Sequence, residues 1–113
     1  MGLELILLPV YYENAKSAES YTIFHCNKDR YLFDQIEEIP ERQFSVTFKG
    51  FIEDEEQFRH GPIEKNEYEE ELTYALVEDL VKCNPHPEAL KNQAIWAYLS
   101  KLSPSTKVAL YWN

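Results

Sequence analysis

Near the amino terminus, residues 3–8 read LELILL, a run that is apolar at every position except Glu4. A strand covered on both faces has this continuous apolar pattern, so the run predicts a buried strand near the centre of a sheet. The last apolar run of the chain, at residues 108–112, reads VALYW and predicts a final strand. We expect this final strand to lie beside the first, which would join the two ends of the chain in one sheet.

Two further strands are expected between these ends. Tyr21–Cys26, rich in β-branched and aromatic residues, predicts a short strand that follows a polar loop at residues 11–20. Gln43–Ile52 alternates, with Phe44 and Phe48 among the apolar residues of one face and polar residues on the other. Such alternation predicts a half-exposed strand, with antiparallel neighbours.

Three helices are expected. The first follows a capping residue, either Asn27 or Asp29, and ends at Pro40. The second is expected over Glu67–Cys83, because an asparagine and a glutamate three residues later resemble a capping box at its start. The third begins in the proline-rich turn that follows and ends at Ser103.

The expected order of elements is strand, strand, helix, strand, helix, helix, strand. It predicts a single α+β domain over residues 1–113, in which one mixed sheet of about four strands packs against three helices. A chain of 113 residues is long enough to bury a hydrophobic core without disulfides. The sequence contains no repeat or linker that would divide it into two domains.

The net charge of −9 is concentrated in one segment. Eleven acidic and three basic residues lie between Phe51 and Lys82, whereas the rest of the chain has nine acidic and eight basic residues. A segment with this charge is suited to a basic partner. Nucleic acids and anionic membranes require clustered lysine and arginine, so we expect neither as a direct ligand.

The acidic segment supplies most of the candidate contact residues. No helix end or other local structure accounts for the acidic residues in the expected loop at residues 53–56. Charge there would, however, also prevent edge-to-edge pairing of the preceding strand. Those of the expected helix form one stripe, which is either a solvent-exposed face or a contact surface. On the third helix Trp96 falls on the polar side, so it is either a partner-facing anchor or a core residue. The candidates are Glu53, Asp54, Glu55, Glu56, Glu67, Glu71, Glu78 and Trp96.

We therefore expect a small protein-interaction domain of the inhibitor, antitoxin or immunity-protein kind, which contacts a basic protein partner. The alternative is a small ligand-binding domain or enzyme, with a pocket beside the sheet formed by Tyr21, His25 and Asp79. Asp79 falls within an apolar stripe of the expected helix, where it is either a buried working carboxylate or a residue at the stripe's edge. A homo-oligomer is compatible with the sequence.

No cofactor or metal ion is expected. His25 and Cys26 are zinc-ligand types, but adjacent strand residues point to opposite faces and cannot reach one ion together. The three isolated glycines exclude a phosphate-binding loop or a dinucleotide fingerprint. The two cysteines and the absence of a signal peptide predict reduced thiols and a cytoplasmic location, without a disulfide.

Overall fold

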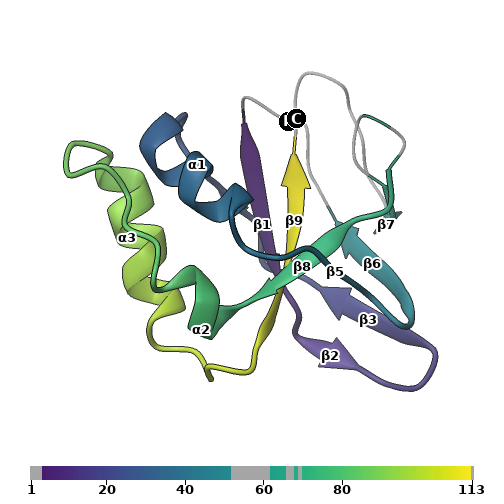
Figure 1. The fold of residues 1–113 in the computed structure, drawn as a ribbon. Coiled ribbons are helices and arrows are strands. Elements are labelled where there is room, and N and C mark those ends of the chain that lie inside the picture. The colour runs from purple at the N-terminus through teal and green to yellow at the C-terminus, as the bar shows by residue number, and fades with distance from the viewer. Residues whose placement is uncertain (1–3, 52–61, 66–67, 69, 113) are drawn as a thin grey trace.

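A five-stranded antiparallel sheet with the order β4-β1-β9-β8-β5 lies at the centre of the fold (Figure 1). The computed structural model describes residues 4–51, 62–65, 68 and 70–112. Strands β1 and β9 pair antiparallel from Leu5 opposite Trp112 to Pro9 opposite Val108, so the expected pairing of the first and last strands is confirmed. The strands of this sheet are β1 (Leu5–Pro9), β4 (Phe24–His25), β5 (Arg42–Gln43), β8 (Thr73–Leu76) and β9 (Lys107–Trp112).

A second sheet, with the order β2-β3-β6-β7, makes the expectation of one four-stranded sheet wrong. Strands β3 and β6 are parallel, whereas the other pairs in this sheet are antiparallel. The expected loop at residues 11–20 contains β2 and β3, joined by a turn in which the Asn14 side chain accepts hydrogen bonds from two backbone N–H groups. Strand β3 buries Ala18 and Ser20 on one face, whereas both residues of β2 are exposed. The strands of this sheet are β2 (Tyr12–Glu13), β3 (Ser17–Ser20), β6 (Thr47–Phe51) and β7 (Pro62–Ile63).

The strand expected over Gln43–Ile52 is divided between the two sheets. Its first residue, Gln43, belongs to β5 of the five-stranded sheet, and Thr47–Phe51 form β6 of the other, while Ile52 lies outside the described residues. The predicted apolar face is nevertheless correct, because Phe44 and Phe48 both contact the core between the sheets. The alternation thus identified the buried side chains but not the crossing from one sheet to the other.

Helix α1 (Arg30–Glu37) forms where the sequence predicts it. The Asp29 side chain caps it by accepting a hydrogen bond from the Leu32 backbone N–H at 3.0 Å. Its apolar residues, including Leu32 and Ile36, are buried beneath the helix. Pro40 follows closely and prevents the helix from continuing.

In the described part of Glu67–Cys83, the expected helix is wrong except for four residues. Thr73–Leu76 form strand β8, and helix α2 (Val77–Leu80) is only four residues long. Strand β8 pairs with β9 on one side and with β5 on the other. This long-range pairing overrides the local helical pattern, and the β-branched and aromatic residues Thr73 and Tyr74 are well suited to it.

Helix α3 (Leu90–Leu99) ends before the expected Ser103, and its buried residues are Asn92, Ile95, Trp96 and Leu99. Trp96 is 7% exposed, and its Nε1–H donates a hydrogen bond to the Leu80 carbonyl at 2.8 Å. Of the two alternatives for Trp96, the structure therefore supports the core residue and not the partner-facing anchor. Apolar residues occur on nearly every side of α3, so their spacing did not identify the inner face.

The five-stranded sheet is covered on both faces (Figure 1). Leu5 and Leu7 of β1 face a core shared with the three helices, whereas Ile6 and Leu8 face a core shared with the second sheet. The expectation of a first strand buried on two faces is confirmed, as is the α+β class in a compact single domain. Among the described residues no helix is long and apolar enough to cross a membrane.

Candidate functional site

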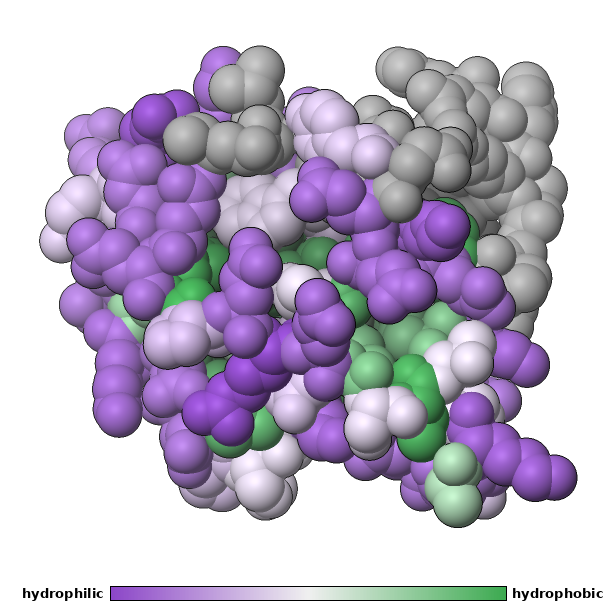
Figure 2. Space-filling model, turned by 45° about the vertical axis from the view of Figure 1, so that its right-hand side comes forward, coloured by the Kyte–Doolittle hydropathy of each residue, from purple (hydrophilic) through white to green (hydrophobic). Residues whose placement is uncertain are grey.

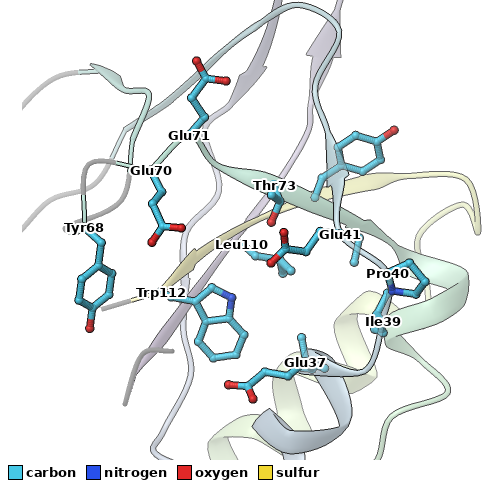
Figure 3. Close-up of a pocket in the computed structure, with 13 residues that line it drawn as sticks. Glu37, Ile39, Pro40, Glu41, Tyr68, Glu70, Glu71, Thr73, Leu110 and Trp112 are labelled. Atoms are coloured by element: carbon cyan, nitrogen blue, oxygen red, sulfur yellow. The ribbon is translucent and has the colours of Figure 1, made fainter.

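A hollow of about 330 Å³, which we call the acidic cleft, lies where the end of α1 approaches strands β8 and β9 (Figure 3). This volume is at the lower end of the roughly 300–1,000 Å³ typical of small-molecule pockets, so it suits one side chain more than a large ligand. The residues that line it come from α1 and the segment after it, from the segment before β8, and from β8 and β9. They are Ile36, Glu37, Ile39, Pro40, Glu41, Tyr68, Glu70, Glu71, Thr73, Tyr74, Ala75, Leu110 and Trp112.

The charged residues that line the acidic cleft are all glutamates. Figure 3 shows the carboxylates of Glu37, Glu41 and Glu70 directed toward the hollow around the Trp112 side chain. The carboxylate of Glu71 points away from that hollow. Three carboxylates around one small hollow make it attractive to a cation.

The indole of Trp112 forms an aromatic wall of the acidic cleft. The buried Phe33 ring packs against it in a T-shaped contact, with ring centroids 5.5 Å apart and ring planes at 89°. Trp112 is half-buried, because β9 brings its side chain to the border between the helical core and solvent. A fixed tryptophan ring beside carboxylates is a favourable surface for a cation.

The end of α1 places two glutamates on the same side of the acidic cleft. The backbone N–H of Ile39 donates to the Ile36 carbonyl at 3.0 Å, and Pro40 then turns the chain away from the helix toward β5. Glu37 therefore stands on the last position of α1, and Glu41 stands just before β5. Both side chains are exposed and reach the hollow from two different backbone segments.

Glu37 and Glu38 occupy the end of α1 where the helix macrodipole disfavours negative charge. Each such carboxylate costs roughly 0.3–1 kcal/mol of helix stability at an exposed site. Arg30, at the first position of α1, is likewise on the end where a cation is disfavoured, although it pairs with Asp34 at 3.2 Å. Local helix energetics thus give no reason for glutamate at position 37. Because the end of the helix at Pro40 can be predicted, the unfavourable position of Glu37 could have been recognised from the sequence.

The structure places the predicted contact residues in different environments. Residues 53–56 and Glu67 lie outside the described part of the chain. Glu71 lines the acidic cleft, but Glu78 is exposed on α2 and does not line it. Trp96 is buried, so a partner cannot reach it in the folded protein. Sequence reasoning therefore missed Glu37, Glu41, Glu70 and Trp112.

The three residues of the alternative pocket lie in separate parts of the fold, with Tyr21 in the segment between β3 and β4. Tyr21 is exposed and donates a hydrogen bond to Glu19, which raises the pKa of the tyrosine because the bond stabilises its protonated form. His25 is exposed on β4. Asp79 lies on α2, 3.9 Å from an Arg42 nitrogen. None of the three lines the acidic cleft or either of two further hollows, one beside β6 and one at the start of α1.

The two other hollows have mixed charge and offer less selectivity. One lies beside β6 and is lined by Lys16 and Lys65 as well as by glutamates. The other lies at the start of α1, where Lys28 and Arg30 accompany Asp29. The carboxylate of Asp29 is already occupied there, because it caps α1 and accepts a hydrogen bond from the His86 backbone N–H at 2.9 Å.

Both cysteines are free thiols in the core and lie away from the acidic cleft. Burial raises the pKa of Cys26 to about 12 and also raises the pKa of Cys83, so both thiols remain protonated at neutral pH. A protonated buried thiol is a poor nucleophile and a poor metal ligand. In the part of the chain that the structure describes, no group of three or more histidine, cysteine, aspartate and glutamate residues is arranged to hold a metal ion.

Comparisons of the chain with protein-family models, with curated proteins and with solved structures found no match.

Proposed function

We propose that this protein is a small interaction domain that binds a basic segment of a protein partner in the acidic cleft. The observation that carries the proposal is the set of three glutamate carboxylates directed at one hollow beside the Trp112 ring. A protein of this kind would act as an inhibitor, an antitoxin or an immunity-like neutraliser of its basic partner. No cofactor is needed for such a role.

The charge of the whole chain supports this proposal. A net charge of −9 attracts a basic protein over distance and speeds the encounter, whereas the carboxylates of the cleft fix where its cation binds. On the face shown in Figure 2, hydrophilic residues cover most of the surface and hydrophobic residues occupy small areas between them. Recognition through charge therefore fits this surface better than a broad apolar interface.

The edges of both sheets also favour recognition by side chains. In the part of the chain that the structure describes, each sheet ends at both edges on a strand of two residues: β4 and β5 in one sheet, β2 and β7 in the other. Edge strands this short offer little backbone for a partner strand or a second copy to pair with. The free thiols of the core are suited to a reducing compartment, so we place the interaction in the cytoplasm.

Calorimetry with the full chain and the peptide acetyl-Gly-Arg-Gly-Lys-Gly-amide tests the proposal. The double variant Glu37→Gln/Glu41→Gln is compared with Glu78→Gln/Glu88→Gln, which removes the same charge from exposed positions outside the cleft. We expect the first variant to lose most of the affinity and the second to lose little.

Raising the salt from about 0.01 M to about 0.15 M should weaken binding, because the Debye length falls from about 30 Å to about 8 Å. Absence of binding, or equal losses in the two double variants, would overturn the proposal.

A further inference from the structure

We infer that the acidic cleft selects the guanidinium of an arginine side chain over the ammonium of a lysine. This inference rests on the proposed function, because it specifies which basic group of a partner the cleft receives. Three features of the cleft support it: a flat aromatic wall, carboxylates spread around that wall, and a small apolar base.

The flat wall is the indole of Trp112. Phe33 and this indole form a T-shaped pair at 89°, a contact with the core that favours one orientation of the ring. A guanidinium is planar and weakly hydrated, so it can stack on such a ring with little loss of hydration. An ammonium is compact and strongly hydrated, and it gains less from a flat surface.

The carboxylates around Trp112 come from three separate segments. Glu37 belongs to the end of α1, Glu41 precedes β5 and Glu70 precedes β8, and Figure 3 shows their carboxylates on different sides of the ring. They do not converge on a point, since no group of acids among the described residues could hold a metal ion. A guanidinium has five N–H donors in a rigid plane and can reach two such carboxylates while stacked. An ammonium is a point charge and would approach fewer of them.

The size and base of the acidic cleft fit the rest of an arginine side chain. Its volume of about 330 Å³ suits a single long side chain. Leu110 and Ile39 lie among the residues that line it, and they offer apolar surface to the methylene stem that precedes a guanidinium.

Three tripeptides, acetyl-Gly-X-Gly-amide with arginine, lysine or citrulline as X, test the inference in titrations of the full chain. Citrulline has nearly the shape of arginine but no charge. We expect arginine to bind roughly tenfold more tightly than lysine, which corresponds to about 1.4 kcal/mol, and citrulline to bind more weakly than both.

Equal or tighter binding of lysine would overturn the inference and leave the proposed function intact. If citrulline bound as well as arginine, or if no tripeptide bound, both would be overturned.

The variant Trp112→Phe tests whether the ring is the source of the selectivity. Phenylalanine keeps an apolar side chain in the core but is a weaker surface for a cation. We expect the preference for arginine over lysine to shrink several-fold, while the fluorescence of the buried Trp96 confirms that the variant folds. An unchanged preference in a folded variant would contradict the role assigned to Trp112.

Discussion

The ring of Phe33 and the indole of Trp112 form a T-shaped pair, with centroids 5.5 Å apart and planes at 89°. Phe33 belongs to α1 and Trp112 to β9, so this contact joins the helical layer to the central strand of the five-stranded sheet. The same contact holds the aromatic wall of the acidic cleft in place. The cleft is therefore coupled to the packing of the core.

Phe33→Leu should destabilise the protein and weaken peptide binding together. The leucine loses the T-shaped contact and some buried volume, for an expected loss of roughly 1–2 kcal/mol of unfolding free energy. Because the indole is then less well held, the affinity for the arginine tripeptide should fall several-fold. Urea unfolding and calorimetry measure the two effects, and a destabilised variant with unchanged affinity would show that Phe33 does not support the cleft.

Glu37→Lys should stabilise the fold and weaken binding at the same time. Lysine at the end of α1 is favourable to the helix macrodipole, so we expect an increase of roughly 0.3–1 kcal/mol in unfolding free energy. Binding of the basic peptide should fall, because a cation then occupies the rim of the cleft. Glu88→Lys is a useful control. Position 88 lies just before α3, where the helix macrodipole disfavours a cation, so this substitution should not increase the unfolding free energy. Loss of stability in Glu37→Lys would contradict this account.

Trp96→Phe should destabilise the protein without affecting peptide binding. The substitution removes the 2.8 Å hydrogen bond to the Leu80 carbonyl, at a cost of about 0.5–1.5 kcal/mol, whereas that carbonyl keeps its hydrogen bond from the Cys83 backbone N–H at 3.0 Å. Thermal or urea unfolding measures the loss, and a titration measures the affinity. A large loss of affinity in a stable variant would instead support Trp96 as a contact residue.

Alkaline pH should destabilise the protein through Cys26. Its pKa is about 12 in the folded state and about 9 in the unfolded chain, so between these values the unfolded state binds fewer protons than the folded state. The free energy of unfolding therefore falls as the pH rises above about 9, at up to about 1.4 kcal/mol per pH unit from this thiol. In the Cys26→Ala variant, the unfolding free energy should decline less steeply between pH 8 and pH 11. Parallel curves for the two proteins would rule out this contribution.

The parts of the fold that the sequence predicts correctly depend on local or very strong patterns. The run at residues 3–8 is buried on both faces, and Asp29 caps α1 through a neighbouring backbone N–H. The helix prediction for residues 67–83 is wrong because strand β8 in this segment is held by pairing with the distant β9. Two short strands, β2 and β3, were missed for the same reason, since β3 is held by pairing with the distant β6 of a second sheet.

The acidic cleft was only partly predictable. Glu71 was among the predicted contact residues, whereas Trp112 was read as part of a strand with no functional role. The unfavourable position of Glu37 at a helix end was visible in the sequence, but its proximity to Glu70 depends on the sheet that brings β8 beside β9. Charge density along the chain pointed to residues 53–56, which lie outside the described structure.

The most direct test of the account uses the indole N–H signals of the two tryptophans of the chain, Trp96 and Trp112. A two-dimensional nitrogen–proton NMR spectrum resolves both during a titration with acetyl-Gly-Arg-Gly-amide. We predict that the Trp112 signal shifts and saturates, while that of Trp96, buried and bonded to the Leu80 carbonyl, stays in place. A shift of Trp96 with Trp112 unmoved, or no saturable shift of either, would contradict a cation-binding cleft at Trp112.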